Sequence, residues 1–144
     1  MTSSTRRLAL TITAAASLTL HAANPKLWKV PESAEKVKNP IKSTAASLAT
    51  GKKLYAKECQ DCHGKTGQGD GPGAKDLELK PPSLRADDFQ SQSDGTLFYK
   101  ITKGRSEMPS YRKSFTDDER WHVVNYLRTF AEVKTAEASK GDSL

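Results

Sequence analysis

Two cysteines and a histidine that lie close together carry the most distinctive chemistry in this sequence. The chain has two cysteines, Cys59 and Cys62, and His63 follows the second one directly. In a C-x-x-C-H motif the two thiols can add to the two vinyl groups of a haem, and the adjacent histidine is then held beneath the iron as an axial ligand. The motif therefore predicts one covalently bound haem c, held by Cys59, Cys62 and His63.

Two other kinds of site could use the same residues. A redox-active dithiol of the thioredoxin type should open a helix after a strand. Here the motif closes an expected helix, and the chain has no alternating strand pattern. A zinc site needs about four ligands, and beyond the first 22 residues His122 is the one further soft candidate. Both alternatives fit the sequence less well than covalent haem does.

Met108 is the candidate for the second axial ligand of the iron. The chain has two methionines, Met1 and Met108. Met1 belongs to a segment that is expected to be removed, so Met108 would be the methionine that remains. Pro109 favours an extended backbone at Met108, which suits a ligand on a loop. A core filler is the alternative role for a single methionine. His122 is the rival ligand, but its neighbours three and four residues away on a helix are largely polar, which indicates a surface histidine.

His63 should donate its outer ring N–H to a backbone carbonyl, which fixes the tautomer and the orientation of the ring. Pro72 is the candidate acceptor, and Pro81 and Pro82 are fallbacks; a proline that only forms a turn is the alternative. The surrounding residues 64–82 are rich in glycine and proline and predict a loop. A phosphate-binding loop is disfavoured because no Gly-Lys-Ser/Thr sequence follows and no strand precedes.

Residues 1–22 have the layout of a secretory signal peptide. Two arginines and no acidic residue precede a 13-residue apolar run from Leu8 to Leu20, and Ala22 offers a small residue for cleavage. The run is shorter than the about 20 residues that span a bilayer. An uncleaved membrane anchor is the alternative. The segment predicts export to a bacterial periplasm.

Length and composition predict one modest domain with a thin polypeptide core. The chain has 144 residues, 35% of them hydrophobic, and a formal charge of +6. A buried haem would complete such a core. The basic residues are scattered and predict a mildly basic docking surface for an acidic redox partner, where charge mainly speeds encounter. No nucleic-acid-binding motif accompanies the charge, so no nucleic acid is expected as a partner.

Four regions are expected along the chain: the signal peptide 1–22, an extended arm or linker 23–43, a domain 44–133 and a polar, frayed tail 134–144. Three prolines argue against a helix in the arm, and whether the arm wraps over the domain or is a flexible linker stays open. The expected elements of the domain are a helix over 43–58, a turn near 74–78, a helix over 93–103, a loop over 105–114 and a helix from 117 to about 130.

Local signals set the ends and the contacts of these helices. Ser93 or Asp94 can cap the second helix, and Gly104 can end it in a left-handed conformation. Thr116 and Glu119 form a capping box for the last helix. Gly51 is costly inside a helix and indicates close approach of another helix.

The sequence resembles the class I c-type cytochromes, in particular the small bacterial monohaem kind. The resemblance covers about residues 44–131 and rests on five motifs: Gly51-x-x-x-Tyr55, Cys59-x-x-Cys62-His63-Gly64, Gly67-Gln68-Gly69-Asp70-Gly71-Pro72, Met108-Pro109-x-Tyr111 and Trp121-x-x-Val124-Asn125-Tyr126-Leu127-Arg128. It implies an all-α cytochrome c fold of three to five helices around one haem. The resemblance also implies that the first and last helices of the domain cross near Gly51.

The same resemblance implies a role for each site residue. Cys59 and Cys62 are the thioether anchors, His63 is the proximal ligand, Met108 is the distal ligand, and Pro72 matches the family's hydrogen-bonding proline. A haem with both axial positions filled shuttles electrons and does not activate oxygen or peroxide. The expected function is therefore a periplasmic electron carrier that is not an enzyme.

The arm 23–43 departs from the minimal pattern of this family. It resembles extensions of cytochrome domains that serve as subunits of respiratory complexes. The alternative function is therefore a haem c subunit of a larger respiratory or dehydrogenase complex, including one with a membrane-associated partner.

Overall fold

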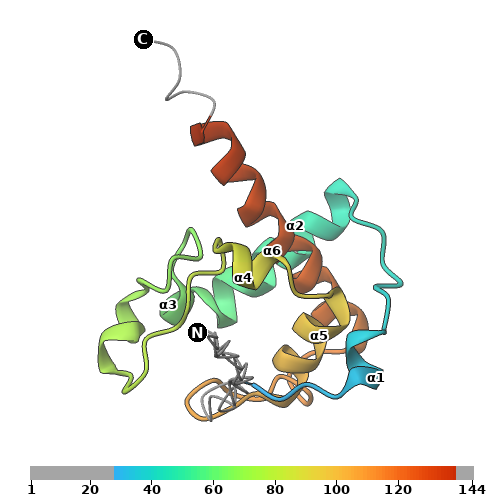
Figure 1. Cartoon of the computed structure of the whole chain (residues 1–144), viewed down its shortest axis with the longest axis horizontal. Helices are drawn as coiled ribbons and strands as arrows, with labels where there is room; N and C mark the ends of the chain where they lie inside the picture. Colours follow the sequence, from blue (N-terminus) through green and yellow to red (C-terminus); the bar gives the residue numbers. More distant parts are fainter. Residues whose placement is uncertain (1–27, 139–144) are drawn as a thin grey trace, which may run out of the picture.

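The computed structural model describes residues 28–138 (Figure 1). The predicted signal peptide, residues 1–22, and the first part of the arm lie outside the described residues. Within the described range the chain forms six α-helices and one 3-10 helix: α1 (Glu32–Glu35), α2 (Ala45–Glu58), α3 (Gln60–His63), η1 (Pro72–Asp76), α4 (Asp87–Gln90), α5 (Asp94–Lys103) and α6 (Asp117–Ala138).

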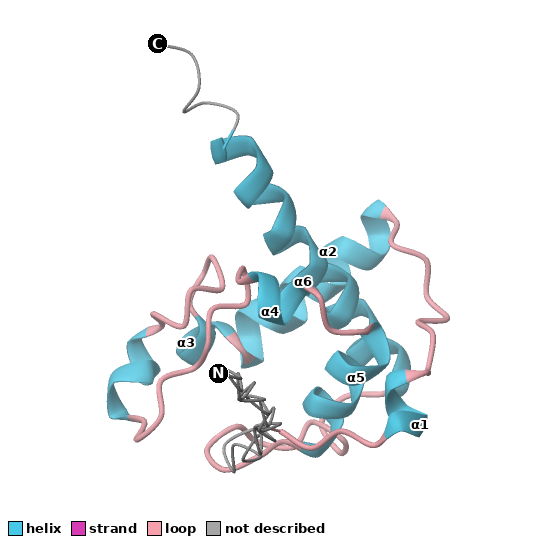
Figure 2. Ribbon diagram, viewed as in Figure 1, coloured by secondary structure: helices cyan, strands magenta, loops and turns pink. Residues whose placement is uncertain are grey.

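The fold of the described residues is all-α, as predicted (Figure 2). The one extended pairing in this part of the chain is an isolated bridge between Arg105 and Met108. The three long helices, α2, α5 and α6, are the ones that the sequence predicts. The one-turn helices α1, α3 and α4 bring the number of α-helices above the expected three to five. The sequence does not predict them, because helices this short leave no periodic pattern.

Helices α2 and α6 cross at Gly51 and form the main helix pair of the domain (Figure 1). A Cβ atom built on Gly51 would lie 2.1 Å from the carbonyl oxygen of His122 and 2.8 Å from the Cβ of Tyr126. A side chain at this position would therefore collide with the backbone of α6. The predicted reason for a glycine inside this helix is confirmed.

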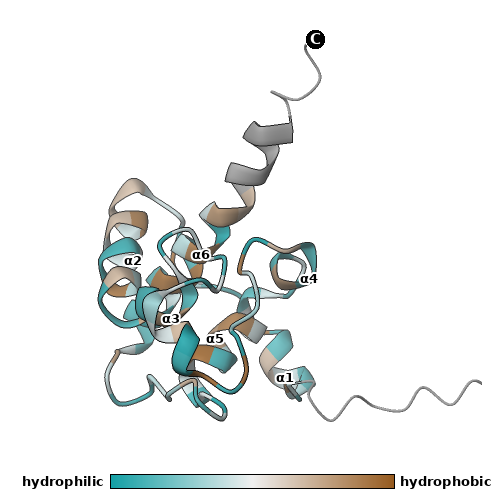
Figure 3. Ribbon diagram, turned by 90° about the vertical axis from the view of Figure 1, so that its left-hand side faces the viewer, coloured by the Kyte–Doolittle hydropathy of each residue, from teal (hydrophilic) through white to brown (hydrophobic). Residues whose placement is uncertain are grey.

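The core lies where α2, α5 and α6 meet, and the apolar segments of α5 and α6 appear in brown in Figure 3. It is built largely from large apolar and aromatic side chains: Tyr55, Leu84, Leu97, Ile101, Tyr111, Phe115, Trp121, Val123, Val124, Leu127 and Phe130. The apolar side of α6 is buried, with Val124 0% and Val123 1% exposed. Tyr55 also packs edge-on against Phe130, at 5.3 Å between ring centroids.

The predicted capping box at the start of α6 is present. The amide of Glu119 donates to Thr116 Oγ1 at 3.2 Å, and the amide of Thr116 donates to Glu119 Oε2 at 2.8 Å. Ser93 caps α5 by accepting from the amide of Thr96 at 3.1 Å. Gly104 ends α5 with the predicted positive φ, +63°, but its ψ of 172° makes the backbone extended there and not left-handed helical.

Helix α6 continues to Ala138, beyond its predicted end near Phe130. The first residues of the segment expected to be a frayed tail, 134–144, are therefore helical. This stretch contains alanine and glutamate, which favour helices, and its first glycine is Gly141. Polarity alone does not end a helix, so α6 runs past its predicted end.

The described part of the arm folds back over the domain and does not form a free linker. Ser93 Oγ donates to the carbonyl of Glu35 at 2.8 Å. A Cβ on Gly95 would lie 2.1 Å from the carbonyl oxygen of Ala34. The arm also contains one helical turn, α1, where none was expected. Pro31 stands just before this turn, where the missing N–H of a proline costs nothing.

Asn125 on α6 holds the end of the arm. Its side-chain NH2 donates to the carbonyl of Ile41 at 3.1 Å and to Ser47 Oγ at 2.9 Å. Its Oδ1 accepts from the side chain of Asn39 at 2.8 Å. Asn125 is 6% exposed, so these groups have little access to water.

Asn125→Ala should therefore loosen the arm. We expect the variant to lose about 2 kcal/mol of unfolding free energy, because buried polar groups are left without partners. Proteolysis within residues 28–43 should become faster. Denaturant unfolding and limited proteolysis check this, with Asn39→Ala as the milder control because Asn39 is half-buried. Wild-type stability and cleavage of the Asn125 variant would show that the arm is held by other contacts.

Candidate functional site

The C-x-x-C-H motif forms a single turn at the end of α2. The amide of Cys59 closes α2 by donating to the carbonyl of Tyr55 at 2.9 Å, and the amide of His63 donates to the carbonyl of Cys59 at 2.9 Å. Cys62 and His63 belong to α3. The two thiols form no disulfide. The backbone therefore gathers both thiols and the imidazole in a single turn, and the motif closes a helix as predicted.

Both thiols have a pKa above the ordinary value of a cysteine. Burial raises the pKa of Cys59 to about 12, and the neighbouring Glu58 and Cys62 contribute to the rise. Burial also raises the pKa of Cys62, with smaller contributions from Asp61 and Glu107. Reactive dithiols have a lowered thiol pKa. The environment of this motif therefore disfavours the dithiol alternative.

The imidazole of His63 fits the ligation of a haem iron. Burial lowers its pKa, which favours the neutral form that coordinates metals. Its Nδ1 is buried and has no hydrogen-bond partner in the described part of the chain. Two thiols in one turn, followed directly by an imidazole, are the donor set of a C-x-x-C-H haem-attachment motif. The residues present therefore fit a haem c.

Pro72 starts η1 on the loop that passes this turn. Its carbonyl does not accept from His63 Nδ1 in the structure, because that atom has no partner. The predicted hydrogen bond between His63 and Pro72 stays a prediction for the haem-bound protein.

The glycine-rich loop packs backbone against backbone on the haem-binding turn. The amide of Gly69 donates to the carbonyl of His63 at 2.8 Å, and the amide of Gly71 donates to that of Cys62 at 3.2 Å. A Cβ on Gly71 would lie 2.1 Å from the carbonyl oxygen of Asp61. These glycines therefore permit close approach to the motif.

Met108 lies on a tight two-residue turn within the predicted loop 105–114. The amide of Arg105 donates to the carbonyl of Met108 at 2.8 Å, and the amide of Met108 donates back at 3.0 Å. Ser106 has a φ of +52°, as one position of such a turn requires. A Cβ on Gly104 would lie 2.6 Å from the carbonyl oxygen of Met108, so this glycine lets the turn lie against the end of α5.

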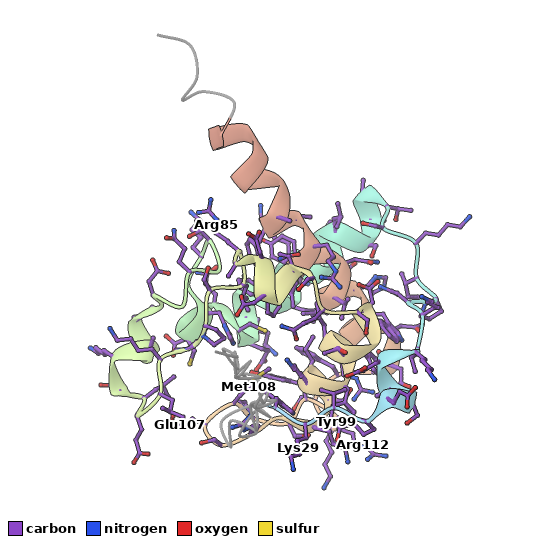
Figure 4. All side chains as sticks on the ribbon, viewed as in Figure 1. Lys29, Arg85, Tyr99, Glu107, Met108 and Arg112 are labelled. Carbon is purple, nitrogen blue, oxygen red and sulfur yellow. The ribbon has the colours of Figure 1, made fainter. Side chains whose placement is uncertain are left out.

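The side chain of Met108, labelled in Figure 4, is half-buried and packs against the apolar core. The side chain of Cys59 packs against the same core. Tyr111, three residues after Met108, connects the two sides of the site. Its hydroxyl donates to the carbonyl of Glu58 at 2.7 Å, immediately before Cys59, and its amide donates to the carbonyl of Ile101 at 3.1 Å. The sequence shows Tyr111 as part of a motif but does not reveal this connection.

His122 is not the surface histidine that the sequence predicts. It is half-buried, and its Nδ1 lies 2.9 Å from Ser47 Oγ at the crossing of α2 and α6. The prediction used only the polar neighbours of His122 on its own helix, and these neighbours do not reveal that Ser47 approaches from α2. This contact assigns His122 to the helix crossing.

Two features of the described residues bear on metal centres and on membrane spans. Across residues 28–138 no group of three or more histidine, cysteine, aspartate or glutamate residues could hold a metal ion. A zinc centre therefore lacks a ligand set in this range. Among the helices of the same range, none has the length and apolar character needed to cross a membrane.

Comparison with known proteins places these features in a family. The family described as "cytochrome C oxidase, cbb3-type, subunit III" matches residues 46–127, which is more than half of the chain. A chain of the Kuenenia stuttgartiensis reducing HAO-like protein complex is similar in structure, with 33% sequence identity and a TM-score of 0.59. The match covers 65% of the present chain and 49% of that chain, so the present chain spans about half the length of this relative. No curated protein matches the sequence.

Proposed function

The chain belongs to the c-type cytochrome domain family described as cytochrome c oxidase, cbb3-type, subunit III, and we propose that it is a periplasmic electron carrier with one covalent haem c ligated by His63 and Met108. Membership of the family supports electron transfer by a haem c. One observation carries the finer assignment: Cys59 and Met108 pack against the same apolar core, and Tyr111 joins their two segments through the carbonyl of Glu58.

Each site residue has a separate role in this proposal. Cys59 and Cys62 hold the haem by thioether bonds, His63 supplies the proximal nitrogen, and Met108 supplies the distal sulfur. The carbonyl of Pro72 accepts from His63 Nδ1, the atom that has no partner in the structure. When bound, the haem supplies an iron that accepts and returns one electron between Fe(III) and Fe(II).

The protein residues themselves explain why we propose a carrier and not an enzyme. With His63 and Met108 both bound to the iron, no position at the metal would be left for a substrate. The soft sulfur of Met108 favours the ferrous state and raises the reduction potential. The turn from Arg105 to Met108, which lies against Gly104 at the end of α5, would hold the backbone of the distal ligand.

We propose that the partners are redox proteins with an acidic docking surface. The segments on either side of Met108 carry the exposed basic residues Lys103, Arg112 and Lys113. Such charges speed the encounter with an oppositely charged partner and contribute less to the final affinity. Export to the periplasm rests on residues 1–22, which have the composition of a signal peptide.

A second function is favoured by the comparison with a solved structure. The similar chain from Kuenenia stuttgartiensis belongs to a complex, and the present chain would then be a haem c subunit of a larger respiratory or dehydrogenase complex. A partner would meet the outer face of the arm, where Val37 is an exposed apolar residue, 45% accessible. Size-exclusion chromatography of native periplasmic and membrane fractions separates the two functions, because a subunit co-migrates with a large complex and a carrier elutes alone.

Met108→Ala tests the ligation. We expect the variant to keep its covalent haem, because the thioether bonds are untouched. Its reduction potential should fall by on the order of 100 mV, since axial ligands are a main determinant of haem potential. The ferric protein should lose the long-wavelength absorbance of sulfur–iron ligation and bind imidazole readily. Potentiometry and absorbance titration measure these changes.

Met108→Leu is the matched control for packing. Leucine fills a similar volume without sulfur, so it should change the potential and the spectrum as alanine does while losing less stability. If both variants keep the wild-type potential and spectrum, Met108 is not the distal ligand.

A further inference from the structure

Glu107, the residue before Met108, connects the distal turn to the opposite side of the site. Its Oε1 accepts from the amide of Glu78 at 2.9 Å, and its Oε2 accepts from the amide of Leu79 at 3.3 Å. In Figure 4 Glu107 lies on the side of Met108 that faces this loop. Both carboxylate oxygens are therefore used on two consecutive backbone N–H groups.

The two donors belong to the segment that leaves η1. Helix η1 packs against α3, which carries Cys62 and His63. The connection therefore reaches from the distal turn to the proximal side of the site.

The other hydrogen bonds of the distal segment run elsewhere. Ser110 Oγ donates to the carbonyl of Thr102 at 2.7 Å, and Tyr111 bonds to Ile101 and Glu58. These contacts fix the segment to α5 and to the end of α2. The Glu107 contact fixes its far edge, next to Met108 itself.

The backbone of Met108 would follow any movement of Glu107. Met108 is paired with Arg105 by two hydrogen bonds, so Arg105 to Met108 form one small closed turn. Freeing the carboxylate of Glu107 frees the whole turn on that side. A ligand with a flexible side chain, such as methionine, depends on its backbone for placement.

We propose that Glu107 is a positioning residue for the distal ligand, tying the Met108 turn to the backbone at 78–79 and so limiting how often the sulfur leaves the iron. The proposal rests on the proposed function. Groups that orient a metal ligand tune the site without touching the metal. The measurable consequence is the rate at which an external ligand replaces Met108.

The experiment compares imidazole binding to the ferric holoprotein in wild type, Glu107→Gln and Glu107→Ala. Glutamine keeps one acceptor oxygen and alanine keeps none. We expect imidazole to bind about threefold faster to the glutamine variant and about tenfold faster to the alanine variant, as the loss of one or two charge-assisted hydrogen bonds at an exposed site predicts. The long-wavelength absorbance of sulfur ligation should remain in both.

Glu78→Gln is the matched control. It removes the same charge from the same region, but it keeps the amide of residue 78 that donates to Glu107. We expect it to bind imidazole at the wild-type rate. Wild-type rates of imidazole binding in both Glu107 variants would overturn the proposal, because they would show that the Glu107 contacts do not hold Met108 in place. An equal acceleration in Glu78→Gln would also overturn it, because the loss of a charge alone would then explain the effect.

Met108→Ala, measured in parallel, separates this proposal from the function on which it rests. If Met108→Ala itself binds imidazole no faster than wild type, ligation by Met108 fails and the role of Glu107 fails with it. If Met108→Ala binds imidazole rapidly and the Glu107 variants behave as wild type, only the role of Glu107 fails.

Discussion

Replacing both Cys59 and Cys62 with serine should abolish covalent haem attachment and, with it, most of the folded structure. Serine cannot form the thioether bonds, and the polypeptide core is small because 35% of the residues are hydrophobic. Cys59 packs directly against that core. Haem staining after denaturing electrophoresis measures the attachment, and far-ultraviolet circular dichroism measures the helix content.

The single variants Cys59→Ser and Cys62→Ser are the graded controls. Each keeps one thiol, so each should retain some covalent haem and a stability between that of wild type and the double variant. A double variant that still carries haem through denaturation, or that folds as well as wild type without it, would contradict the role assigned to these cysteines.

Gly51→Val should be the most damaging substitution away from the haem-binding turn. The new Cβ would lie 2.1 Å from the carbonyl oxygen of His122, and backbone cannot move aside as a flexible side chain can. Helices α2 and α6 would have to separate along the main helix pair of the domain. We expect a loss of about 3 kcal/mol in unfolding free energy, at the upper end of the range for overpacking. Denaturant unfolding of the holoprotein measures it.

Ala49→Val controls for the helix propensity of valine. Ala49 lies on the exposed side of α2, so its substitution should cost a few tenths of a kcal/mol. Equal losses in the two variants would show that valine weakens α2 itself and that the crossing at Gly51 tolerates a side chain.

The sequence was sufficient to predict those structural features that a local pattern of residues reveals. The capping box of Thr116 and Glu119 joins residues three positions apart, so its spacing reveals it. Gly51 is conspicuous because glycine is rare inside helices without a packing reason. The haem-binding turn is equally local, because Cys59, Cys62 and His63 lie within five residues.

The contacts that complete the site join distant parts of the chain and leave no spacing to recognise. Tyr111 reaches the carbonyl of Glu58, and Glu107 reaches the amide of Glu78. The partner in both contacts is a backbone atom, which every residue has. The type of the partner residue therefore gives no way to predict the contact from the sequence. His122 was misassigned for the same reason, since Ser47 approaches it from another helix.

Intact-mass spectrometry of the protein from cells that export and mature it, together with its pyridine-haemochrome spectrum, tests covalent attachment of one haem to this chain. We expect a chain heavier by the mass of one haem, with residues 1–22 removed and no thiol left to titrate. A chain of unmodified mass with two free thiols would contradict it.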